Sequence, residues 1–65
     1  MSNKIKRKNR ILNTIRNSDG ITLAEINAQT NISKNAIYAD IIELVTSRKV
    51  EEQRHELFTT YRVID

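Results

Sequence analysis

The 65-residue sequence contains no cysteine and no proline, and Gly20 is its only glycine. Without cysteine, the chain can form neither a disulfide framework nor a thiolate metal site. With one glycine, it cannot build a glycine-rich loop that cradles phosphates. No apolar run approaches the roughly 20 residues that span a bilayer, and the N-terminus lacks the apolar segment of a signal peptide. We therefore expect a cytoplasmic protein without a membrane segment.

Side chains suited to catalysis are equally scarce. His55 is the only histidine, and the sequence offers it no nucleophile arrangement and no set of metal ligands. Glu51 and Glu52 are neighbours in a strand-like segment, so they would point to opposite faces and cannot act as an acid–base pair. We expect no enzymatic activity, no cofactor and no metal, and we interpret His55 as an exposed turn residue.

The composition favours one small folded domain over residues 1–65. Hydrophobic residues make up 38% of the chain and charged residues 29%, a balance that argues against disorder. A chain of this length lies near the lower limit for a single core without staples.

Positive charge is concentrated at the N-terminal end. The net charge is +3, but residues 1–16 carry six bases and no acid, whereas residues 17–65 carry five bases and eight acids. This asymmetry predicts that a polyanion meets the N-terminal end; the alternative is a basic leader that only increases solubility. In the first case, a phosphate or minor-groove arm would bind in a strongly salt-dependent way. Its contacting residues would be Lys4, Lys6, Arg7, Lys8 and Arg10.

A first helix is predicted over about residues 4–17, because apolar residues recur there at helical spacing. This stripe consists of Ile5, Ile11, Leu12 and Ile15. The turn-forming run at 17–20 should end the helix, with Gly20 as a left-handed cap.

A second, shorter helix of about eight residues should follow. Thr22 and Glu25 have the spacing of a capping box, in which each side chain bonds the other's backbone N–H. Leu23 and Ile26 would face inward. The helix should stop by Asn31, because asparagine adopts a positive φ more readily than most residues.

The third helix is the longest, from about Lys34 to Arg48, with Ser33 as its N-cap. Its predicted buried face consists of Ile37, Ile41, Leu44 and Val45. Its outer face holds Asn35, Ala39 and Thr46, with Tyr38 and Ile42 on the shoulder. A face that is small and uncharged near the helix N-terminus is suited to close approach to another molecule.

From Val50 the periodicity changes to that of strands. Segments 50–53 and 57–64 predict two strands around a polar turn at 54–56. A lone hairpin is marginal in water, so we expect Val50, Tyr61 and Val63 to pack on the helices. The predicted fold is a small α+β domain, three helices followed by a C-terminal two-stranded β-hairpin.

Two segments carry a resemblance to a known family. Glu25-Ile26-Asn27, with Asn31-Ile32-Ser33 after a gap of three residues, resembles the E-L-A-x-x-x-G-V-S signature of winged helix-turn-helix domains. Residues 36–44 resemble the T-I-R-R-D-L-x-x-L run of DeoR-type regulators, and residues 61–63 are similar to the end of small pilus-operon transcriptional regulators. The resemblance covers about residues 11–64, and it implies a helix-turn-helix over 22–48 and a wing hairpin over 49–65.

The sequence also departs from that pattern. Asn27 and Asn31 replace the usual alanine and glycine, and Arg48 stands where a glycine usually ends the recognition helix. Tyr38 and Ala39 replace two arginines of DeoR-type proteins, so phosphate contacts of those arginines cannot be transferred. We expect neither the effector domain of those regulators nor a small-molecule ligand.

In a helix-turn-helix, the second helix enters the major groove of DNA with its N-terminal residues at the base edges. The groove-facing positions would be Ser33, Lys34, Asn35, Tyr38, Ala39 and Ile42, and Thr22 at the start of the preceding helix completes the set. Asn35 could read adenine, and Lys34 could reach guanine or a phosphate. Ala39 or Ile42 could meet a thymine methyl, and Tyr38 a phosphate. The alternative for Tyr38 and Ile42 is that they extend the core.

The resulting prediction is a sequence-specific binder of double-stranded DNA that regulates transcription. Its size suits a phage- or plasmid-type accessory regulator, which would act in the host cytoplasm if phage-encoded, and a homodimer on DNA stays open. The alternative is a protein-interaction module that binds a polymerase subunit, a nuclease or another regulator. The acidic wing residues Glu51, Glu52 and Glu56 favour this alternative, because they would repel a phosphate backbone.

Overall fold

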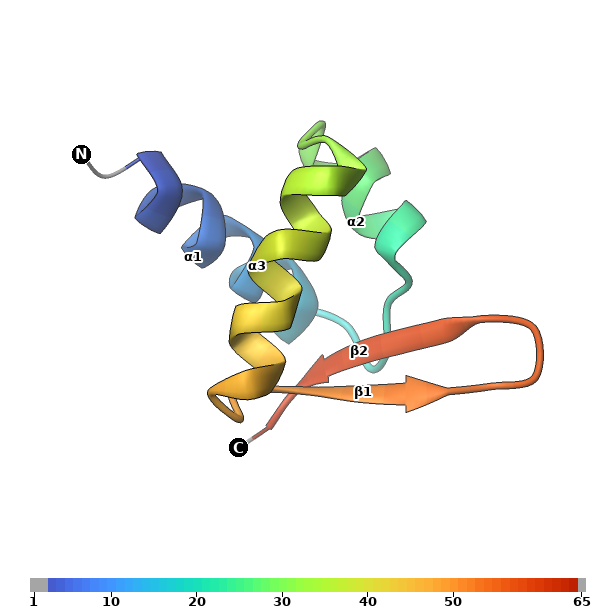
Figure 1. Cartoon of the computed structure of the whole chain (residues 1–65). Helices are drawn as coiled ribbons and strands as arrows, with labels where there is room; N and C mark the ends of the chain where they lie inside the picture. Colours follow the sequence, from blue (N-terminus) through green and yellow to red (C-terminus); the bar gives the residue numbers. More distant parts are fainter. Residues whose placement is uncertain (1–2, 65) are drawn as a thin grey trace.

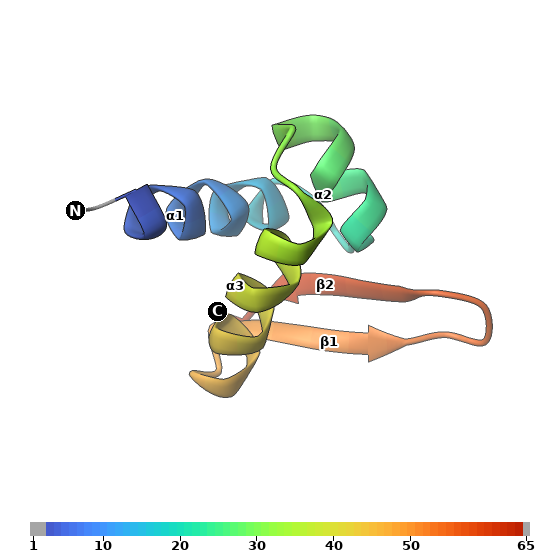
Figure 2. The same cartoon turned by 45° about the horizontal axis from the view of Figure 1, so that its top comes forward.

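The computed structural model describes residues 3–64 (Figure 1). Its elements are α1 (Asn3–Arg16), α2 (Leu23–Thr30), α3 (Lys34–Thr46), β1 (Val50–Arg54) and β2 (Thr59–Val63). The strands form one antiparallel hairpin that projects to one side of the three helices (Figures 1 and 2). The predicted α+β winged helix-turn-helix is therefore confirmed.

The end of α1 differs from the prediction in one detail. The hydroxyl of Ser18 donates to the carbonyl of Ile15 at 2.9 Å, and its backbone N–H donates to the same oxygen at 3.0 Å. Gly20 has a φ of 146° and lies four residues beyond the last helical residue, Arg16. Its predicted role as the helix cap is wrong, because Ser18 satisfies the helix end and Gly20 serves the following turn.

The helix-turn-helix forms where its local signals predict it. Thr22 N–H donates to Glu25 Oε1 at 2.9 Å, and Glu25 N–H donates to Thr22 Oγ1 at 3.2 Å, which completes the capping box. Asn31 ends α2 with a φ of 60°. The side chain of Asn27 donates to the carbonyl of Ile32 at 2.7 Å. Asn27 therefore stabilises the turn between α2 and α3 through a side-chain hydrogen bond that the usual small residue cannot make.

Helix α3 is capped at both ends. Ser33 Oγ accepts from the N–H of Ala36 at 3.2 Å. At the other end Arg48 takes a left-handed φ of 64°. Arg48 N–H then bonds Val45 O and Lys49 N–H bonds Leu44 O, which is the Schellman pattern that usually needs a glycine. The helix stops at Thr46, two residues before the predicted end.

The hairpin pairs Val50 with Val63 and Arg54 with Thr59. The second strand begins at Thr59 rather than at the predicted position 57, so Leu57 and Phe58 belong to the turn. His55 N–H closes this turn by donating to Phe58 O at 2.7 Å.

The segment before α2 joins the hairpin as a short third edge. Ile21 and Tyr61 exchange backbone hydrogen bonds of 3.1 and 2.8 Å. Ile21 is extended, but it forms only this isolated bridge and no strand of its own.

One core joins all the elements. Its buried side chains are Ile11, Ile15, Ile21, Ile26, Ile37, Ile41, Leu44, Val50 and Tyr61, with Val63, Val45, Leu12 and Leu23 packed against them. The predicted packing of the hairpin through Val50, Tyr61 and Val63 is confirmed. Ile5 was expected in the apolar stripe of α1, but it is 62% exposed. Ile5 belongs to the N-terminal end of α1, and this end extends past the other helices (Figure 2). Of the helices within residues 3–64, none has the length and apolar character to cross a membrane.

Candidate nucleic-acid interface

The outward face of α3 holds the residues that the sequence predicts at a DNA groove. Its exposed members are Ser33, Lys34, Asn35, Tyr38, Ala39 and Ile42. Tyr38 is 55% and Ile42 48% exposed, so both lie at the surface rather than in the core. Whether this face contacts DNA stays a prediction.

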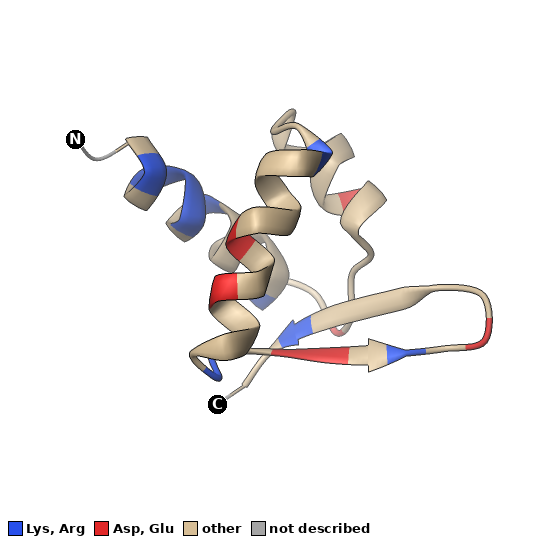
Figure 3. Cartoon of the chain, in the orientation of Figure 1, with Lys and Arg blue, Asp and Glu red and all other residues tan. Residues whose placement is uncertain are grey.

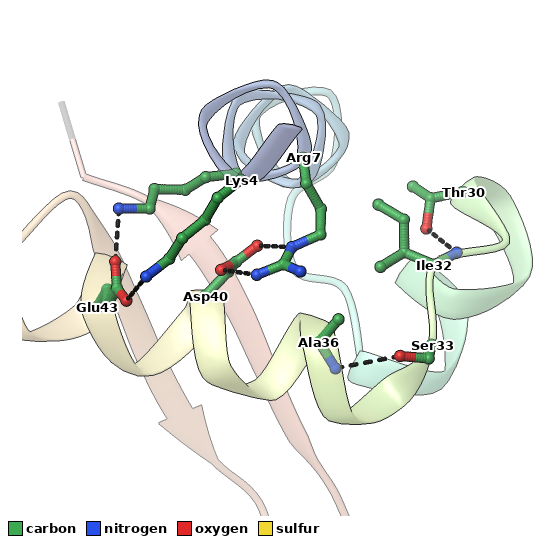
Figure 4. A network of polar contacts seen from close by, with 9 residues as sticks. Lys4, Arg7, Thr30, Ile32, Ser33, Ala36, Asp40 and Glu43 are labelled. Atoms are coloured by element: carbon green, nitrogen blue, oxygen red, sulfur yellow. Dashed lines mark hydrogen bonds and ion pairs between the residues drawn. The ribbon is translucent and has the colours of Figure 1, made fainter. Parts of the chain in front are cut away.

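Both acids of α3 point away from this face, toward α1. The carboxylate of Asp40 is fully buried and accepts two hydrogen bonds from Arg7, Nε to Oδ2 at 2.7 Å and Nη2 to Oδ1 at 2.8 Å (Figure 4). Hydrogen bonding to Asp40 raises the pKa of Arg7. This fork-to-fork geometry is the strongest form of ion pair that a carboxylate makes.

Glu43 lies one turn further along the same side of α3. Its oxygens contact Lys8 Nζ at 2.6 Å and Lys4 Nζ at 3.1 Å. The hydrogen bonds from Lys8 and Lys4 lower the pKa of Glu43 below its ordinary value of 4.5. Since Asp40 and Glu43 are the only acids of α3, its outward face carries no negative charge.

The basic N-terminal residues lie in the helix that the sequence predicts over about residues 4–17. Residues 3–10 are the first turns of α1, and the basic and acidic segments of α1 and α3 lie near each other (Figure 3). Three of the five predicted phosphate contacts, Lys4, Arg7 and Lys8, bond the acids of α3. Lys6 and Arg10 are exposed and form no ion pair with another residue of 3–64. The basic cluster therefore contains three residues that pair with acids of α3 and two, Lys6 and Arg10, that do not.

Thr22 has a structural task of its own. Its hydroxyl accepts from the N–H of Glu25 and also donates to the Glu25 carboxylate at 3.1 Å. Its predicted contact with DNA is untested, and the neighbouring carboxylate works against a phosphate at this point.

Sequence reasoning missed Asp40. It lies three residues after Ile37 and four before Leu44, in the middle of the buried stripe of α3. An acid at such a position requires a cation or several hydrogen-bond donors, so the sequence could have predicted that Asp40 has a partner. It could not have identified that partner, because Arg7 lies 33 residues earlier in the chain.

Arginines neutralise most of the acidic charge of the wing. Arg62 Nε bonds Glu51 Oε1 at 2.9 Å, and Arg54 Nε lies 3.7 Å from Glu52 Oε2. Of the three wing acids, only Glu56 lacks an ion pair with another residue of 3–64. Two of the three wing acids therefore have an arginine partner, which weakens the repulsion expected from the sequence.

The wing tip is apolar and exposed. Leu57 is 89% and Phe58 53% exposed. Phe58 stacks on His55, with ring centroids 4.5 Å apart and planes inclined by 22°, and His55 Nε2 lies 3.1 Å from Thr60 Oγ1. His55 is the exposed turn residue that the sequence predicts.

A hollow of about 160 Å³ lies between the outer parts of the wing and α3. Tyr38 and Ile42 form its helical side, Glu52 and Arg54 its strand side, and Tyr61 borders it as well. Burial raises the pKa of Tyr61. In the part of the chain that the structure describes, no cluster of three or more histidine, aspartate or glutamate side chains could hold a metal ion.

Comparison with known proteins bears on the fold. No family model matches the chain, and no match was found among curated proteins. Among solved structures, the chain is similar to the crystal structure of the apo-Zalpha of zebrafish PKZ, with a TM-score of 0.89 and 14% sequence identity over 95% of this chain and 97% of that chain. At this identity the likeness shows the winged-helix fold alone.

Proposed function

We propose that this protein is a small sequence-specific binder of double-stranded DNA that regulates transcription, with α3 in the major groove. One observation carries the proposal. The two acids of α3 face α1 and are paired there, so the outward face of α3 presents only neutral and basic residues. A helix with an acid-free outer face can enter the groove without repelling the phosphates on either side.

The N-terminal residues of α3 supply the chemistry for reading bases. Asn35 carries the amide that can bond adenine at two positions, and Lys34 can reach guanine or a phosphate. Ala39 and Ile42 are exposed further along the same face, where an apolar contact with a thymine methyl is available. Tyr38, one turn beyond Lys34, can donate a hydrogen bond to a phosphate. The resemblance of residues 36–44 to DeoR-type regulators supports the same function.

The test is a fluorescence-anisotropy titration of labelled duplexes at two salt concentrations. We expect binding to random duplex that weakens steeply with salt. Selection from a randomised duplex pool should enrich one motif, and the binding stoichiometry on that motif shows whether one or two copies bind.

The decisive variant is Lys34→Ala with Asn35→Ala, which should abolish preference for the selected motif. A matched control is Lys49→Ala with Asn17→Ala, which removes one exposed lysine and one exposed asparagine outside the N-terminal part of α3 and should keep the preference. Salt-insensitive behaviour, or equal loss of preference in both variants, would contradict the proposal.

A second candidate is a protein-interaction module, and the exposed Leu57 and Phe58 at the wing tip favour it. Apolar side chains at a hairpin tip suit a protein surface better than a phosphate backbone. This candidate predicts no salt-sensitive binding to any duplex, so the same titration decides between the two.

A further inference from the structure

Within residues 3–10 of α1, Lys6 and Arg10 are the two cations that form no ion pair with another residue of 3–64. They stand four residues apart and thus on the same side of the helix, where like charges repel each other. Both are exposed, and neither has an acidic partner among residues 3–64. Their positive charge makes this side of α1 receptive to an anion.

The same side of α1 borders a hollow of about 280 Å³. Asn3, Lys6, Arg7 and Arg10 line it from α1, at spacings of three and four residues, and Ile32 closes it from the turn between α2 and α3. No acid is among these lining residues. Every polar side chain in the hollow is a hydrogen-bond donor, and only the Asn3 amide can also accept. The hollow therefore suits a small anion rich in oxygen acceptors.

Arg7 makes this hollow more rigid than a surface lysine pair. Its Nε and Nη2 are held by Asp40 at 2.7 and 2.8 Å, which fixes the plane of the guanidinium. The group has five N–H donors in a fixed fork, and two hydrogen bonds leave others available. A donor that is already oriented loses little entropy when an anion binds.

The position of the hollow relates it to α3. Ile32 directly precedes Ser33, the N-cap of α3. Figure 4 shows the Arg7 side chain at the α1–α3 contact and Ile32 beside it, in the turn between α2 and α3. We infer that the hollow binds a backbone phosphate of the duplex whose groove α3 enters, on the flank next to the helix-turn-helix turn. This inference rests on the proposed function, and it assigns the phosphate contact to Lys6 and Arg10 rather than to the whole basic cluster.

Such a contact orients the protein without reading sequence. Removing it should weaken binding to every duplex by a similar factor and leave the preferred motif unchanged. It should also flatten the salt dependence, because each lost phosphate contact lowers the slope of log affinity against log salt by about 0.9.

The experiment compares two variants of the full chain that lose the same charge. Lys6→Gln with Arg10→Gln removes the free cations, and Lys4→Gln with Lys8→Gln removes two that pair with Glu43. Anisotropy titrations at four or five salt concentrations give the slope for each, and circular dichroism checks folding. We expect the slope to fall by about 1 for the first variant and to stay near that of the unmodified chain for the second.

A phosphate titration followed by amide NMR tests the hollow without DNA. Shifts should concentrate at residues 3–10 and Ile32 and should vanish in Lys6→Gln/Arg10→Gln. Equal slopes for the two variants, or phosphate shifts spread evenly over the chain, would overturn this inference alone. Absence of duplex binding by the unmodified chain would overturn the proposed function and, with it, the assignment to a duplex phosphate.

Discussion

Asp40 places a carboxylate inside the protein, at the contact between α1 and α3. Removing such a group from water costs several kcal/mol, and only a partner with good geometry offsets that cost. Arg7 provides it through two parallel hydrogen bonds. Because the Arg7 side chain is 33% exposed, the pair sits at the edge of the core, where water moderates the penalty.

Removing Arg7 alone should therefore destabilise the protein more than any surface change. We expect Arg7→Met to lower the free energy of unfolding clearly, since it leaves a buried carboxylate without a partner. Urea denaturation measures this. The matched change Lys8→Met breaks an exposed pair and should cost less than about 1 kcal/mol. Equal losses for the two variants would show that Asp40 is solvated after all.

Arg48 has a left-handed backbone conformation that a long side chain rarely adopts. A side chain at a left-handed φ of 64° costs about 1–2 kcal/mol, which glycine avoids at an entropic cost of roughly 0.5–1 kcal/mol. Arg48→Gly should thus stabilise the protein by about 0.5–1 kcal/mol and raise its melting temperature by a few degrees. Arg48→Ala keeps the Cβ atom and should not raise it. A gain in both variants would point to charge rather than backbone conformation.

The contact between α1 and α3 is held by charges at two successive turns, Asp40 and Glu43. The outer pairs, from Lys4 and Lys8 to Glu43, are exposed to solvent. They contribute most where the carboxylate is ionised and salt is low.

Acid should weaken this contact in a defined range. The pKa of Glu43 is lowered in the folded state from its ordinary value of 4.5. Its contribution is therefore present above pH 4.5 and is lost as the pH falls through the folded-state pKa. We expect the unmodified chain to be more stable than Glu43→Gln in urea at pH 7, and the difference to shrink below pH 4.5. The difference at pH 7 should also shrink in 1 M salt; a difference independent of pH would exclude the ion pairs as its source.

Elements whose signals are local were predictable from sequence, and elements that depend on distant partners were not. Thr22, Asn31 and Ser33 each act on backbone within three or four residues of themselves, so spacing alone identified their caps. Asp40 needed a partner from another helix. The start of the second strand was misplaced because register depends on pairing with β1, which left Leu57 in the turn instead.

The candidate site shows the same division. The outward face of α3 followed from helical periodicity, because the opposite face had to be the core. The basic residues of α1 were recognised as a cluster, but composition cannot tell Lys8, which has a partner in α3, from Lys6, which has none. That distinction needs the packing of two helices.

In the whole molecule, Tyr61 joins the hairpin to the helices. It is 6% exposed, belongs to the common core, and pairs with Ile21 ahead of α2. A chain of this size has a total stability of roughly 3–10 kcal/mol. Loss of one large core side chain can consume much of it.

We expect Tyr61→Ala to cost about 3–5 kcal/mol and to unfold the helices together with the hairpin. Circular dichroism at 222 nm and tyrosine fluorescence from Tyr38 should then report the same transition. Tyr61→Phe keeps the buried ring and should change stability by less than about 1 kcal/mol. Helical signal that survives full loss of the hairpin would show that the two parts fold independently.

The bridge between Ile21 and Tyr61 also has a kinetic consequence. It encloses the whole helix-turn-helix in one loop. Closing a long loop costs conformational entropy before the contacts between its ends can stabilise the structure. The caps of α2 and α3 act locally, so those helices can form early, while docking of the hairpin completes the core late. Substitutions at Tyr61 should then act mainly on the unfolding rate, which determines how long the folded molecule persists.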